Sequence, residues 1–71
     1  MEMNKLNKLR GIIAEKRKGA EEIADALNIN IATYYRKLNG DSEFSISEVN
    51  ALIKLLELTE EEASKLFFKG E

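Results

Sequence analysis

The spacing of apolar residues is the feature of this chain that most restricts its fold. They recur at steps of three and four, proline is absent, and the β-branched residues are scattered rather than alternating. Steps of three and four place side chains on one face of an α-helix, whereas alternation indicates a strand. A chain of 71 residues is also long enough for only one small core. We therefore expect a single all-α domain over residues 1–71, built from five short helices.

The apolar stripes place these helices along the chain. The first is predicted over residues 4–17, and Gly11 lies inside it. Glycine costs about 1 kcal/mol relative to alanine in a helix, so its presence there indicates close backbone packing. The other four helices are predicted over residues 20–27, between Asn30 and Asn39, over residues 46–57, and from Thr59 to residue 68.

Local signals mark the helix ends. Gly19 and Asn30 stand at N-cap positions, where glycine and asparagine are favoured. In "FSISEV" and "LTEEEA" a Ser or Thr precedes a Glu by three residues, which is the capping-box pattern. Asn28 stands where the chain must leave the second helix, and asparagine tolerates the left-handed conformation well. About three residues therefore separate the second and third helices.

The stretch from about 19 to 39 has the pattern of a helix-turn-helix. Ala24 is small enough for two helices to cross closely, Ile29 fills the turn, and Tyr34 with Leu38 anchors the second helix. Such a pair braces its second helix against the first. The outer side of the second helix can then enter a DNA major groove, which is about 12 Å wide.

Composition removes most catalytic chemistry. The chain contains neither cysteine nor histidine, so it lacks thiolate nucleophiles, imidazole bases and the best zinc ligands. No apolar run approaches the roughly 18 residues of a membrane span, and the first ten residues do not resemble a signal peptide. We expect a cytoplasmic protein that is not an enzyme, with no catalytic residue, metal, cofactor, membrane contact or small-molecule substrate.

Charge is distributed unevenly along the chain. The net charge is −2, but residues 1–40 carry eight Lys or Arg against five Asp or Glu, and residues 41–71 carry three against eight. A basic half beside an acidic half suggests one face for a polyanion and another for solvent or a partner. The alternative is an unsorted solvated surface.

Four segments carry a resemblance that covers nearly the whole chain. They are "LRGIIAEK", "EEIADALNI", "YRKLNG" and "SEFSISEVNALIKLLELTEEE". In this order the chain resembles the Cro/CI-type helix-turn-helix family of phage repressors, in a short form found among phage-like repressors. The resemblance implies a lambda-repressor-like fold with the motif at the second and third helices. It also implies a sequence-specific regulator of transcription, commonly a dimer on a palindromic DNA operator.

Three positions depart from that family. Asn28 replaces its usual glycine, and Ala20 replaces a Gln, Thr or Ser that often contacts phosphate. Asp41 stands in the loop after the reading helix, where lysine is frequent. A carboxylate there should repel phosphate.

The third helix carries the predicted reading residues. On a wheel of 100° per residue Tyr34 and Leu38 fall together, with Arg36 opposite. The residues predicted to read bases are Ile31, Ala32, Tyr35 and Arg36, and Arg36 can pair with guanine through its planar fork. For Ile31 the alternative is an inward position, and for Tyr35 a solvent-exposed ring. Phosphate contacts are predicted for Lys16, Arg17, Lys18, Asn30, Thr33, Lys37, Asn39 and Ser42.

Phe67 and Phe68 occupy adjacent helical positions and cannot easily face one small core together. An exposed aromatic on the last helix is a candidate homodimer contact.

Two functions from different classes remain open. The first is a DNA-binding transcriptional regulator, and the second is a protein-binding antirepressor or adaptor on the same scaffold.

Overall fold

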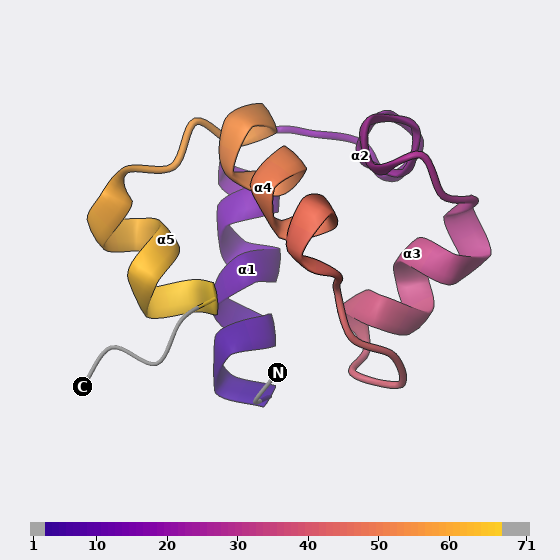
Figure 1. Ribbon diagram of the computed structural model, residues 1–71, viewed down its shortest axis with the longest axis horizontal. Helices are drawn as coiled ribbons and strands as arrows, with labels where there is room; N and C mark the ends of the chain where they lie inside the picture. Colours follow the sequence, from indigo (N-terminus) through magenta and orange to yellow (C-terminus); the bar gives the residue numbers. More distant parts are fainter. Residues whose placement is uncertain (1–2, 68–71) are drawn as a thin grey trace.

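Five α-helices make up the regular structure of the part of the chain that is described. The computed structural model describes residues 3–67, and within that range it contains no strand. The helices are α1 (Met3–Glu15), α2 (Ala20–Leu27), α3 (Ile31–Leu38), α4 (Ile46–Leu55) and α5 (Glu60–Phe67) (Figure 1). The all-α prediction with five short helices is confirmed.

The helices begin where the sequence predicts. Ser45 Oγ accepts a hydrogen bond from Glu48 N, and the Glu48 carboxylate accepts one from Ser45 N, which completes the capping box of α4. Thr59 and Glu62 exchange the same pair of bonds before α5. Because each such cap satisfies backbone N–H groups that have no partner inside the helix, it fixes the first turn.

Two helices end earlier than predicted. The first was expected to reach residue 17 and the fourth residue 57, but they end at Glu15 and Leu55. Arg17 and Glu57 adopt the left-handed conformation, with φ of 60° and 53°. The N–H group that follows each of them bonds to a carbonyl five residues back, which is the Schellman arrangement.

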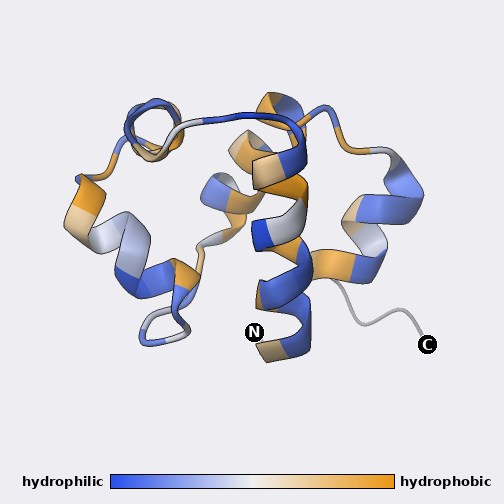
Figure 2. Ribbon diagram, turned by 180° about the vertical axis from the view of Figure 1, so that it is seen from behind, coloured by the Kyte–Doolittle hydropathy of each residue, from blue (hydrophilic) through white to orange (hydrophobic). Residues whose placement is uncertain are grey.

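The core lies between α1, α2, α4 and α5. In Figure 1, α1 and α4 occupy the middle, α5 lies on one side, and α2 and α3 lie on the other. The helix pairs with the most extensive contact are α2 with α4, α1 with α5, and α2 with α3. The buried side chains are nearly all aliphatic, and they include Leu9, Ile23, Leu52, Leu56 and Leu66. Figure 2 shows hydrophobic segments, in orange, recurring along α1, α4 and α5. α3 is therefore an outer helix that rests mainly on α2.

Gly11 does not mark a close backbone approach, so that interpretation was wrong. It is exposed, and a Cβ built on it meets no atom within 4 Å. We expect Gly11→Ala to raise the free energy of unfolding by about 1 kcal/mol, since alanine is the better helix former. Urea denaturation followed by circular dichroism measures this gain.

Gly40 supplies the control for that substitution. Its φ is +91°, and an added Cβ would lie 3.2 Å from Leu6 Cδ1. Gly40→Ala should therefore destabilise the domain in the same assay. Equal effects of the two substitutions would contradict the assignment.

Candidate nucleic-acid interface

Residues 28–30 connect α2 to α3 in a tight turn. Asn28 adopts the predicted left-handed conformation, with φ of 63°, and Ile29 N donates to Ala24 O. The Asn30 side chain then caps α3 by accepting a hydrogen bond of 2.7 Å from Thr33 N. These contacts set the angle at which α3 leaves α2.

The two sides of α3 differ sharply in burial. Tyr34 and Leu38 are buried, whereas Ile31 is 41% exposed and Tyr35 48% exposed. Ala32 and Arg36 are exposed as well. The four residues predicted to read bases thus lie on the solvent side, and the inward alternative for Ile31 is excluded. In Figure 2, α3 runs from a hydrophobic first residue to a hydrophilic stretch near its end.

The two tyrosines have different environments. Their ring centroids lie 5.3 Å apart with planes inclined by 53°. Burial, with Tyr35 nearby, raises the pKa of the Tyr34 hydroxyl, against a smaller lowering influence of Arg10. Tyr34 therefore stays neutral and serves packing, while Tyr35 offers an aromatic edge and a hydroxyl at the surface.

The C-terminal end of α3 is held by two cations. Arg10 of α1 donates from Nη2 to Leu38 O at 3.3 Å and to Asn39 Oδ1. Lys37 Nζ lies 2.6 Å from Glu48 Oε1 of α4, and the two side chains are only 13% and 11% exposed. Lys37 was predicted to contact DNA phosphate. In the structure its ammonium group is instead paired with Glu48 of the same chain.

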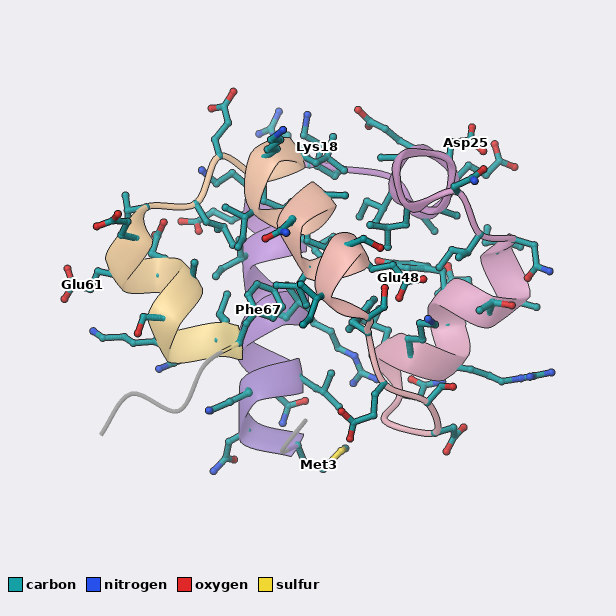
Figure 3. All side chains as sticks on the ribbon, in the orientation of Figure 1. Met3, Lys18, Asp25, Glu48, Glu61 and Phe67 are labelled. Carbon is teal, nitrogen blue, oxygen red and sulfur yellow. The ribbon has the colours of Figure 1, made fainter. Side chains whose placement is uncertain are left out.

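Other predicted phosphate contacts fall into two groups. Asn30, Thr33, Asn39 and Ser42 lie at the two ends of α3 or in the following loop. Lys16 and Arg17 are exposed at the end of α1, and Lys18 forms an ion pair of 3.6 Å with Glu22. In Figure 3, Lys18 lies at the top of the molecule above α1 and α4, whereas α3 lies to the right. The structure does not bring this basic run to the exposed side of α3.

Acidic residues lie near α3 instead. Asp25 on α2 and Asp41 after α3 are exposed, and Figure 3 shows Asp25 beside the start of α3. The suggestion of one face for a polyanion assumed that the cations of residues 1–40, which are close in sequence, are also close in space. Of the eight Lys and Arg residues in that range, three lie on α1, three in the turn after α1 and two on α3.

Two residues that hold α3 were missed from sequence. Arg10 was not singled out as a contact of α3, and Glu48 was predicted only to complete the capping box before the fourth helix. A carboxylate can accept several hydrogen bonds at once. The Glu of a capping box can therefore also bind a lysine, and this capacity was the only hint of the ion pair in the sequence.

Phe67 is partly buried and packs against the core, so it offers only part of its ring as a dimer contact. Phe68, the other predicted contact, lies outside the described residues.

The ion pair makes the stability of the domain depend on pH. Burial acts to raise the pKa of Glu48, but hydrogen bonds from Lys37 and Ser45 N outweigh it and lower that pKa. A lowered pKa gives stability that is present above the unfolded value, about 4.3, and is lost as pH falls through the folded value. We expect Glu48→Gln to be less stable than the parent at pH 7 and nearly equal at pH 2. Thermal unfolding at both pH values measures this, and a constant difference would contradict it.

Residues 3–67 contain no group of three or more His, Cys, Asp or Glu side chains that could hold a metal ion. Over the same range, no helix combines the length and the apolar character of a membrane span.

The fold and this surface define a small all-helical domain with one exposed outer helix. A family model described as the BetR domain matches residues 3–71, so the chain belongs to the BetR domain family. No curated protein and no solved structure matches it. The narrower likeness to Cro/CI repressors stays a prediction.

Proposed function

We propose that this protein is a sequence-specific DNA-binding regulator of transcription in which α2 and α3 act as a helix-turn-helix. The observation that carries the proposal is the exposed side of α3, with Ile31, Ala32, Tyr35 and Arg36 turned outward on a helix whose other side is buried. An α-helix is about 10 to 12 Å across with its side chains, which matches the major groove.

The chemistry of that side fits base edges. Arg36 supplies a planar fork of donors for guanine O6 and N7. Ile31 and Ala32, in the first turn, offer apolar contact for thymine methyl groups. Asn30 and Ser42 flank the helix, and Thr33 lies in its first turn; all three carry groups that can hydrogen-bond phosphate. Lys37 is not among these contacts, because Glu48 holds its ammonium.

Selection from a pool of random duplexes tests the proposal. Purified protein is incubated with the pool at low salt, and bound fragments are sequenced after several rounds. We expect enrichment of one short motif, and a palindrome would also report a dimer with two-fold symmetry. Failure to enrich any sequence would count against DNA reading.

A specific observation supports the second function, a protein-binding antirepressor or adaptor. Asp25 on α2 and Asp41 in the loop after α3 are exposed, and carboxylates repel phosphate. The same surface would suit a partner with basic side chains. Capture of a defined protein partner without any duplex enrichment would favour this function.

A further inference from the structure

Apolar packing holds α3 on one side only. Two of its eight residues, Tyr34 and Leu38, are buried, and the helix packs mainly on α2. These two residues are one turn apart, so they lie within about 40° of each other around the helix axis. Tyr34 and Leu38 form one narrow apolar stripe along α3. Such a stripe fixes the position of the helix, but it opposes rotation of the helix about its own axis only weakly.

The Lys37 to Glu48 ion pair adds a second line of contact. Lys37 projects about 60° from Tyr34, on the side away from Leu38. Its Nζ lies 2.6 Å from Glu48 Oε1, which also accepts a 2.8 Å hydrogen bond from Ser45 N. Figure 3 shows Glu48 in the space between α4 and α3. One carboxylate therefore caps α4 and holds α3 at the same time.

Separating Lys37 from Glu48 is energetically unfavourable. The pair is partly buried, with side chains 13% and 11% exposed, so a charge left there without its partner is less favourable than one at an open surface. Arg10 restrains the same end of α3 through Leu38 O and Asn39 Oδ1. The last turn of α3, which contains Arg36, is thus tied to α1 and to α4 by polar contacts.

We propose that Lys37 and Glu48 are positioning residues that set the rotation of α3 and so the direction of Arg36. The proposal rests on the DNA-binding function above. It assigns Lys37 to orientation and leaves phosphate attraction to other residues. Base recognition needs this kind of support, because a reading side chain must be held within about 0.5 Å and 10 to 20° of its working geometry.

The test compares Lys37→Met with the parent on the duplex recovered by selection. The first readout is discrimination at the base pair where Arg36→Ala relaxes specificity, given as the ratio of affinities for guanine and adenine at that position. The second is the slope of log affinity against log salt. We expect Lys37→Met to lower the discrimination by about fivefold or more, the lower end of what one good base contact contributes, and to leave the salt slope unchanged.

A phosphate contact gives the opposite pattern. Loss of a phosphate-bound lysine reduces the salt slope by about one and weakens all duplexes equally. That result, or unchanged discrimination, overturns the proposal. Lys37→Arg, which can still pair with Glu48, should restore discrimination. In an Arg36→Ala background, Lys37→Met should have no further effect on it, whereas additive effects overturn the proposal.

Two controls complete the design. Lys54→Met removes one exposed lysine of α4 and should change neither readout beyond the general loss of charge. If Lys37→Met does not fold, Glu48→Gln is measured with the same readouts and decides the proposal. A parent protein that binds no duplex refutes the DNA-binding function and the positioning role together, whereas binding by the parent with unchanged discrimination in the variants refutes only the positioning role.

Discussion

Replacing Leu52 with alanine is expected to unfold a large fraction of the protein. Leu52 lies in α4, is 0% exposed, and belongs to the core that α1, α2 and α4 share. Removing a buried leucine costs about 2 to 5 kcal/mol, because the apolar contact is lost and a cavity is left. A domain of this length has a total stability of roughly 4 to 10 kcal/mol. Urea and thermal denaturation followed by circular dichroism should show a large fall in both midpoints.

Ile46 in the same helix provides the comparison. It is 81% exposed, so Ile46→Ala removes almost no buried area and should leave the free energy of unfolding within about 0.5 kcal/mol of the parent. A loss at position 46 as large as that at position 52 would contradict the assignment of the core. A small loss at position 52 would do the same.

The starts of the helices were predictable because their causes are local. Ser45 with Glu48, Thr59 with Glu62, and Asn30 each satisfy N–H groups within three residues of themselves, and such contacts can be recognised in a short window of sequence. The helix ends after residues 15 and 55 were not predictable in this way. Arg17 and Glu57 adopt φ values near +60° that their residue types disfavour, so the surrounding packing must impose them.

The same distinction applies to the candidate interface. The division of α3 into a buried and an exposed side follows from 3.6-residue periodicity and was predicted correctly for Tyr34 and Leu38. The pairing of Lys37 with Glu48 joins residues eleven positions apart on two helices, and no periodic pattern encodes it. The uneven charge along the sequence does not report where the cations lie in space: Arg10 of α1 is bound to the end of α3, whereas Lys18 pairs with Glu22.

This arrangement of charges limits how the protein could bind DNA. The net charge is −2, Lys37 is paired with Glu48, and exposed carboxylates lie near α3. Nonspecific attraction to phosphate, which scales with the number of free cations, is therefore expected to be weak. Under the proposed function, more of the binding free energy must come from contacts to base edges.

Under the proposed function, Arg36 is expected to contribute most to the contacts with base edges. It is an exposed cation of α3, and Lys37 beside it is already bound within the protein. We expect Arg36→Ala to weaken binding to the selected duplex by about 1 to 3 kcal/mol and to relax specificity at one base pair. Titration of labelled duplexes with single base changes, at one fixed salt concentration, measures both effects.

Arg36→Lys separates the charge of this residue from its shape. Lysine keeps the positive charge but lacks the planar fork that pairs with guanine O6 and N7. We therefore expect Arg36→Lys to retain the parent's salt slope while losing most of the discrimination at that base pair. If Arg36→Lys instead behaves like the parent at every position, Arg36 acts through charge alone. If Arg36→Ala leaves affinity for the selected duplex unchanged, α3 does not read DNA through this residue.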